Sequence, residues 1–139
     1  ESLTVSETEH EKHLSRITIV TRGTPHVLDQ IRHQLARIVP VHRVVDLSHR
    51  AFELGHDRPV ERELALVKVA GKGEARAETL RLADAFKAKV VDATTDHFIL
   101  EITGKTAKID QFISIMKPLG LVETCRTGVA AMNRGPESM

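Results

Sequence analysis

The sequence predicts an α+β fold made of two related ferredoxin-like (βαββαβ) units, of which the N-terminal one lacks its first strand and helix. Three observations predict it. Strand-like and helix-like stretches alternate along the 139 residues. The stretch GTPHVLDQI, residues 23–31, aligns with GKTAKIDQF, residues 104–112, at a constant offset of 81 residues. The second copy reads β-α-β-β-α-β, whereas the first reads only β-β-α-β.

The elements of the first unit follow from alternation and from helix signals. Residues 2–6 and 14–21 are expected to be strands, because apolar side chains such as Ile17 and Ile19 alternate with polar ones. A helix is expected to follow, with Thr24 as its N-cap and Pro25 at its first position. Its apolar stripe comprises Val27, Leu28, Ile31, Leu35 and Ile38. Pro40 ends it, and Val41–Leu47 has the pattern of a further strand.

The second unit is expected to begin after a connection. We interpret residues 1–48 as a partial domain, 49–60 as a charged linker without periodicity, and 61–139 as a complete domain. The expected order in that domain is a strand at 63–70, a helix within 71–88, a hairpin over 90–103, a helix at 106–120 and a strand at 121–128. The inward helical positions are Thr79, Leu82, Ala83, Phe86, Ile109, Phe112, Ile113 and Met116. Residues 130–139 are expected to fray.

The repeat shows what the first unit lacks. The aligned pairs include Asp29 with Asp110, Gln30 with Gln111, Ile17 with Phe98, and Ile19 with Leu100. Without a first strand and helix, the N-terminal sheet loses a strand and half of its cover. Exposing that apolar face would cost roughly 25 cal/mol per Å². We therefore expect the chain to open on the second strand of a domain whose start precedes Glu1.

Composition narrows the classes of function. Twenty basic and nineteen acidic residues leave a net charge of +1, and Tyr and Trp are absent, so the sequence has no signature of nucleic-acid binding. The apolar runs are far shorter than the roughly 20 residues of a membrane span. Cys125 is the single cysteine, which fits a reducing compartment. The expected location is the cytoplasm.

Candidate catalytic and metal sites are weak. Of the eight histidines, His10 and His13 fall in a polar loop, and His26 and His33 are seven residues apart, roughly 10 Å along a helix. Solvated surface histidines are therefore the favoured interpretation, and no metal site is predicted. A dyad of Cys125 with a neighbouring-strand His97 is conceivable, but no third group orients it. We predict no catalytic residue.

Two further motifs favour structural roles. The turn Gly71-Lys72-Gly73 lacks a phosphate-binding pattern and fits a plain strand-to-helix turn. The charged residues 61–63 fit a protective role at the end of a sheet better than a role in acid–base catalysis. By contrast, both faces of the strand at 64–69 are apolar, which favours sheet packing or oligomerisation. Interfaces without chemistry are typical of a regulatory subunit.

Several segments, in order along essentially the whole chain, resemble one family. They are ESLTV, SRITIVTRG, VLDQIRHQLARIVPVHRVVDLS, VERELALVKV and CRTGVAAMNRG. They are similar to the regulatory (small) subunits of acetolactate synthase, also called acetohydroxyacid synthase. The resemblance implies an N-terminal ACT domain followed by a C-terminal ferredoxin-like domain, which agrees with the repeat.

The resemblance also implies a role. Such subunits activate a separate thiamine-diphosphate-dependent catalytic subunit and confer feedback inhibition by valine, or another branched-chain amino acid, in isoleucine, valine and leucine biosynthesis. The implied partners are the catalytic (large) subunit and a second copy bound through the ACT domains, with neither nucleic acid nor membrane. The implied cofactors, thiamine diphosphate, Mg and FAD, belong to the catalytic subunit, and none is expected in this chain.

The implied effector site lies mostly upstream of this sequence. In the family its binders are an Asn/Gly turn and an Asn-Ile pair immediately before ESLTV. Only Glu1, Ser2 and Leu3 carry over, as the edge of the effector-binding site. The alternative is a ligand- or metal-sensing regulatory protein of ACT-like fold, which would need a DNA-binding segment or a proper ligand cluster. Stoichiometric tight binding of Ni²⁺ or Zn²⁺ in calorimetry would favour that alternative.

Overall fold

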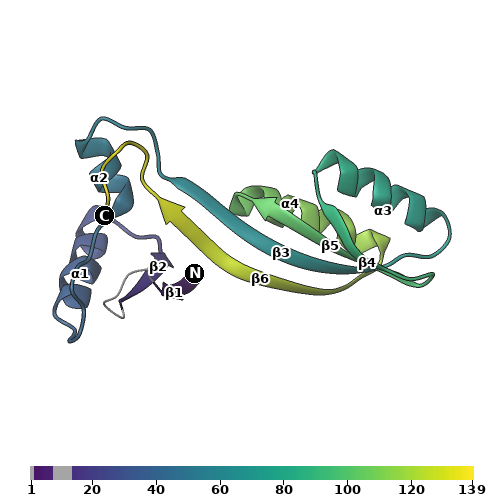
Figure 1. Cartoon of the computed structure of the whole chain (residues 1–139), viewed down its shortest axis with the longest axis horizontal. Coiled ribbons are helices and arrows are strands. Elements are labelled where there is room, and N and C mark those ends of the chain that lie inside the picture. The colour runs from purple at the N-terminus through teal and green to yellow at the C-terminus, as the bar shows by residue number, and fades with distance from the viewer. Residues whose placement is uncertain (1, 8–13) are drawn as a thin grey trace. The chain divides into compact units, whose positions relative to one another are not determined.

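The computed structural model describes residues 2–7 and 14–139 (Figure 1). These residues form two units. Unit 1 comprises the described residues up to Glu61 together with Ala131–Met139, and unit 2 comprises Arg62–Ala130. Both combine helices with a sheet, which confirms the α+β class.

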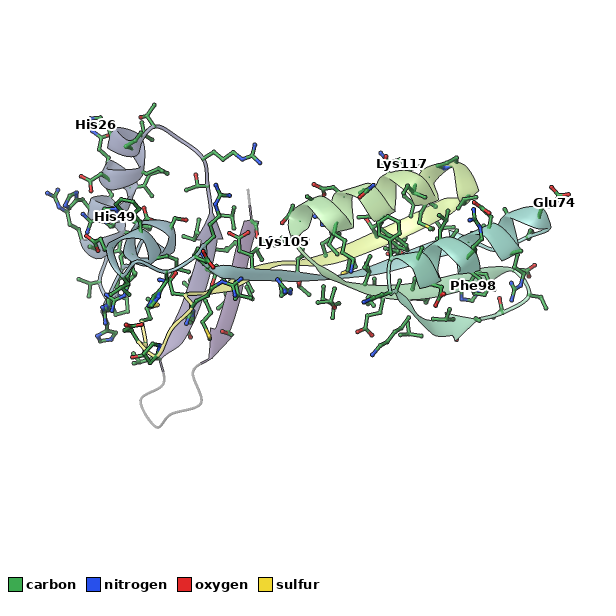
Figure 2. All side chains as sticks on the ribbon, turned by 90° about the horizontal axis from the view of Figure 1, so that it is seen from above. His26, His49, Glu74, Phe98, Lys105 and Lys117 are labelled. Atoms are coloured by element: carbon green, nitrogen blue, oxygen red, sulfur yellow. The ribbon has the colours of Figure 1, made fainter. Side chains whose placement is uncertain are left out.

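Unit 2 holds a four-stranded sheet and two longer helices. The strands are β3 (Val60–Ala70), β4 (Lys89–Ala93), β5 (His97–Gly104) and β6 (Leu121–Met132), in the spatial order β4-β5-β3-β6. Helix α3 (Glu74–Ala85) follows β3, and α4 (Thr106–Met116) with the short 3₁₀ helix η1 (Lys117–Leu119) follows β5. Lys105 and Lys117 mark the two ends of α4 in Figure 2. The order β-α-β-β-α-β confirms the predicted ferredoxin-like arrangement.

The core of unit 2 lies between one face of this sheet and both helices. Its fully or nearly fully buried members are Ala65, Val67, Val69, Ala83, Phe98, Leu100, Ile102, Ile109, Phe112 and Met116. The strand residues alternate along β3 and β5, and the helical residues recur at spacings of three and four, as expected for one buried face each. Leu82, Phe86 and Ile113 pack against this core while remaining partly accessible. The predicted inward positions are therefore confirmed.

Unit 1 holds a two-stranded antiparallel sheet and two helices. Strand β1 (Ser2–Glu7) pairs with β2 (Ser15–Val20), with Leu3 opposite Ile19 and Val5 opposite Ile17. Helix α1 (Pro25–Ala36) begins where predicted, because the Thr24 hydroxyl accepts a hydrogen bond from the Val27 N–H at 3.3 Å.

Two predictions for the middle of unit 1 are wrong. The expected strand Val41–Leu47 is absent: residues 41–46 carry no regular structure, and Leu47 opens helix α2 (Leu47–Glu53). In unit 2 the last strand lies beside the first one, β3, and the described part of unit 1 offers no counterpart of β3 to pair with. Residues 49–53, expected in a linker, belong to α2, whose N-cap is Asp46. The proposed division into domains at residues 48 and 60 stays a prediction.

The C-terminal residues are ordered by contacts within unit 1. Strand β6 continues to Met132, past the expected start of fraying at residue 130. Beyond it, the Arg134 Nε donates to the Arg58 carbonyl at 3.0 Å, and His56 Nε2 lies 3.0 Å from Glu137 Oε2. The expectation that 130–139 fray is therefore wrong, because these side chains tie the segment to residues 56–58.

Candidate functional site

The sequence-predicted effector edge lies on β1. Ser2 is opposite Val20 in the ladder, and Leu3 is opposite Ile19 with its side chain 62% exposed. Glu1 lies outside the described residues. The sheet has two strands, so within the described part of the chain no strand lies along the other edge of β1. An uncovered strand edge of this kind is a ready template for pairing with another chain.

One face of this sheet carries an apolar surface, here called the strand patch, formed by Leu3, Val5, Ile17 and Ile19. Opposite residues of an antiparallel pair share a face, so the register places all four side chains together. Their exposed fractions lie between 46% and 62%. The repeat counterparts of Ile17 and Ile19 in unit 2 are Phe98 and Leu100, which are 2% and 0% exposed. Positions that build the core of unit 2 are thus uncovered in unit 1.

Helix α1 shows the same difference. Its Leu28, Ile31 and Leu35 are half-buried, and no residue of the helix is fully buried. The counterparts at the offset of 81 residues, Ile109, Phe112 and Met116, are all 0% exposed. A contiguous exposed apolar surface of this kind marks a site that contacts another protein or another segment. The strand patch and α1 therefore form a surface of unit 1 that a preceding segment of the same chain or a second chain would cover.

The residues weighed for nucleophilic catalysis are kept apart. Cys125 is exposed on β6, and His97 begins β5. Strand β3 lies between these two strands, which separates their backbones by about 10 Å. In addition, Ala70 pairs with His97 and donates to the Gly120 carbonyl, so Cys125 lies five residues further along β6. The Cys125–His97 dyad is therefore not formed.

The structure instead gathers a hydroxyl, an imidazole and a carboxylate at the turn between β4 and β5. His97 Nδ1 lies 2.6 Å from Thr94 Oγ1, and His97 Nε2 lies 3.0 Å from Asp92 Oδ2. The Thr94 hydroxyl also accepts a hydrogen bond from the Asp96 N–H at 3.2 Å. Because the hydroxyl and both ring nitrogens are engaged within the turn, this cluster ties the hairpin together. Sequence reasoning missed it, although the spacing Asp-x-Thr-x-x-His is local.

A second cluster, of charged side chains and a hydroxyl, joins β3, α4 and β6 by hydrogen bonds and was not predicted from the sequence. Glu63 is 5% exposed, and its carboxylate accepts hydrogen bonds from Arg126 Nε at 2.5 Å and Arg126 Nη2 at 3.0 Å. Arg126 Nη1 reaches Asp110 at 2.7 Å, and the Thr106 hydroxyl donates to Glu63 at 3.2 Å. The hydrogen bond to Glu63, more than that to Asp110, raises the pKa of the Arg126 guanidinium. The cluster therefore has a structural role, because it joins two strands and a helix of unit 2.

The histidines of α1 and α2 make local contacts on the helix surfaces. His26 and His49 lie on different helices, α1 and α2 (Figure 2). His33 lies 3.4 Å from Asp29, and His49 lies 3.1 Å from Glu53. His10 and His13 lie outside the described residues. Within residues 2–7 and 14–139, no three His, Cys, Asp or Glu side chains gather as a metal site would require.

The Gly71-Lys72-Gly73 segment forms the strand-to-helix turn that the sequence favours. Gly73 has φ of +60° immediately before α3, a conformation that glycine adopts without strain. The Lys72 ammonium lies 3.8 Å from the Asp96 carboxylate across the exposed surface.

The helices of the described residues include none with the length and apolar character of a membrane span.

Comparison with known proteins connects this geometry to a family. Residues 62–135 match the family described as "Small subunit of acetolactate synthase". The chain is 43% identical over 135 residues to the acetolactate synthase small subunit of Aquifex aeolicus, covering 96% of this chain and 66% of that protein. It is 37% identical over 140 residues to the isozyme 3 small subunit of Escherichia coli, covering 100% of this chain and 81% of that protein.

A solved structure agrees over nearly the whole length. The acetolactate synthase small subunit from Thermotoga maritima superimposes with a TM-score of 0.82 at 34% sequence identity, covering 98% of this chain and 80% of that one. The family match covers unit 2, and these relatives extend the similarity through unit 1. The chain therefore belongs to the acetolactate synthase small-subunit family.

Proposed function

We propose that this chain is a regulatory subunit that activates the catalytic subunit of acetolactate synthase and confers feedback inhibition by valine or another branched-chain amino acid. The observation that carries the proposal is similarity over the whole chain to proteins named as small subunits of that enzyme. Thiamine diphosphate, Mg²⁺ and FAD would be held by the catalytic subunit. The site of action would be the cytoplasm.

Activation in this proposal is a matter of linkage rather than chemistry. If the chain binds the active arrangement of the catalytic subunit more tightly than the inactive one, it shifts the population towards activity. An effector that favours a different arrangement of the regulatory subunit reverses the shift. Coupling energies of about 1–3 kcal/mol change affinity 5- to 150-fold, which is enough for regulation.

The strand patch supports the proposed homodimer. A second copy that paired along the uncovered edge of β1 would extend the sheet. Apolar side chains of that copy would cover the strand patch, whose four residues are exposed. Ser2 and Leu3 would then stand beside the junction of two subunits, at the edge of the effector site. A ligand bound there would sense the arrangement of the dimer.

Reconstitution tests the regulatory function. The full-length gene product containing this sequence is mixed with the catalytic subunit of the same organism, and acetolactate formation is followed with and without valine, leucine or isoleucine. We expect a several-fold rise in the turnover number on mixing and inhibition by at least one of the three amino acids. Unchanged turnover and no effect of any amino acid would refute the proposal.

A variant of the strand patch tests the dimer separately. Val5→Ser removes apolar area from the proposed interface, so the dimer dissociation constant in sedimentation equilibrium should rise about tenfold, equivalent to about 1.4 kcal/mol. Val122→Ser on β6 is the matched control, because Val5 and Val122 are both 60% exposed. Equal weakening by both variants would contradict a role for the strand patch in self-association.

A further inference from the structure

The four-stranded sheet of unit 2 has two edge strands, β4 and β6, which differ in how well they resist pairing with another strand. Strand β4 is five residues long, begins with Lys89, and has an irregular register between Val90 and Asp92. Short length, lysine and bulges are features by which natural edge strands avoid association. The β4 edge is therefore protected.

The edge formed by residues 122–127 of β6, here called the β6 edge, lacks these protections. Strand β6 spans Leu121–Met132 and contains neither lysine nor proline. Residues 122–127 are all exposed, so both faces of the strand are accessible over this stretch. Figure 1 shows β6 along the outer side of β3, and among the described residues no strand pairs with its other edge. A long uncovered edge of this kind is a template for another strand.

The charged side chains of the β6 edge already have partners in their own chain. Glu123 lies 3.6 Å from the Lys68 ammonium, and Arg126 donates hydrogen bonds to Glu63 and Asp110. A strand that pairs with this edge therefore does not have to compensate either charge, which favours a neutral strand over a strongly acidic or basic one. The β6 edge of a second copy, with one acidic and one basic residue, meets that requirement.

Symmetry restricts how two copies of this edge can pair. A two-fold axis perpendicular to the sheet keeps each face of the joined sheet continuous, which requires that one residue lie opposite its own copy. Centring the pairing on Glu123 or on Arg126 places two like charges opposite each other, which is unfavourable. Centring it on Val122 or on Thr127, at the ends of the edge, pairs fewer of the exposed residues.

The two remaining residues, Thr124 and Cys125, give different neighbours to the charged groups. Centring the pairing on Thr124 places Arg126 opposite an apolar valine and Glu123 opposite a thiol. Centring it on Cys125 places Arg126 opposite Thr124, and Glu123 opposite Thr127. The second arrangement sets a hydroxyl group beside each charged group, and opposite side chains of this kind stabilise a strand pair.

We propose that the β6 edge pairs antiparallel with the β6 edge of a second copy of this chain, with Cys125 opposite its own copy. The contact joins the four-stranded sheets of two copies and is separate from the strand patch of unit 1. Val122 then lies opposite Gly128 of the second copy, which has no side chain, so Val122→Ser leaves this pairing unchanged. A single strand pair is a small interface, so this association depends on protein concentration.

Cross-linking of Cys125 tests the pairing in the full-length gene product containing this sequence. Opposite Cα atoms of antiparallel strands are about 4.5 or 5.5 Å apart, and both distances fit a disulfide bond. Diamide should oxidise the two thiols of a pair to a disulfide, while their two hydrogen atoms reduce diamide to its hydrazine. We expect a dimer on non-reducing electrophoresis, a Cys125–Cys125 link in the peptide map, and no such link in Cys125→Ser.

The neighbouring residue supplies a matched control. In Thr124→Cys/Cys125→Ser the introduced thiol lies on the same exposed stretch, so chance collisions reach it as readily. The proposed register displaces it by two residues from its own copy, so the Cα atoms are about 8 Å apart, beyond the reach of a disulfide. It should cross-link at least tenfold more slowly. Equal or faster cross-linking of this variant would overturn the proposal.

Cys125→Lys tests whether the β6 edge holds copies together. Two like charges would lie opposite each other, so the dissociation constant for self-association in sedimentation equilibrium should rise at least tenfold. Cys125→Ser should leave that constant unchanged. In the wild type, amides of residues 122–127 should exchange hydrogen more slowly as the protein concentration rises. An unchanged constant in Cys125→Lys, or slowing that appears only when the catalytic subunit is added, would overturn the proposal.

Discussion

Leu100→Ala is expected to lower the free energy of unfolding of unit 2 by about 3–5 kcal/mol. The Leu100 side chain is 0% exposed on β5, between Phe98 and Ile102 in the same buried row. Truncation removes buried methyl groups and leaves a cavity in a core that both helices already fill. The loss is a large share of the 5–15 kcal/mol that typically stabilises a domain.

The repeat provides an internal control for this substitution. Ile19 occupies the position equivalent to Leu100, and its side chain is 46% exposed. Ile19→Ala removes the same number of carbon atoms, but the expected loss is at most about 1 kcal/mol because no closed core surrounds them. Urea unfolding combined with hydrogen exchange, of β5 amides for Leu100→Ala and of β2 amides for Ile19→Ala, measures both losses. Losses of similar size would mean that another segment or another chain covers the strand patch in solution.

Arg126→Met is expected to destabilise unit 2 by about 3 kcal/mol. Among the described residues, the substitution leaves the buried Glu63 carboxylate with the Thr106 hydroxyl as its one hydrogen-bond partner and removes the contact to Asp110. A buried charge without its counter-charge is expensive, whereas the pair itself is close to neutral against an apolar replacement. The double variant Glu63→Leu/Arg126→Met is therefore expected to recover most of the loss.

Arg81 offers the matched control for that experiment. Arg81 and Glu78 form a pair of similar geometry on the surface of α3, with side chains 71% and 42% exposed. Arg81→Met is expected to leave the free energy of unfolding nearly unchanged, because exposed pairs are screened by solvent. Thermal and chemical unfolding of the three variants give the comparison. A loss in Arg81→Met as large as in Arg126→Met would contradict the burial argument.

The fold of unit 2 could be predicted because its signals are local and agree with one another. The nearly continuous apolar run in β3 marks a central strand, and the helical spacing of Ile109, Phe112 and Met116 marks the buried side of α4. The segment Val41–Leu47 has an equally good strand pattern. It is not a strand because a strand needs a neighbouring strand to pair with, and the local sequence pattern does not show whether one is present.

Helix α2 was not predicted, because its helical pattern is too short to stand out. Leu47, Ala51 and Leu54 have helical spacing after a good N-cap, Asp46, but charged residues and a glycine surround so short a stretch. The cap, rather than the periodicity, was the usable signal.

The clusters that matter most for stability and binding join residues far apart in the chain. Glu63 and Arg126 meet because of the pairing of β3 with β6, and His56 meets Glu137 because the C-terminal segment returns to it. Neither feature has a local sequence signal. Of the predicted effector edge, Ser2 and Leu3 lie on β1 as expected, and their role stays a prediction.

The two-stranded sheet formed by the described residues of unit 1 has a consequence for how this chain behaves in solution. A two-stranded sheet with one uncovered apolar face is marginally stable by itself. Whatever covers the strand patch also completes the core of unit 1, so the covering partner stabilises the fold by mass action. While the strand patch is uncovered, the sheet is open to proteases and to other strand edges. The lifetime of unit 1 in solution would then depend on how completely the strand patch is covered.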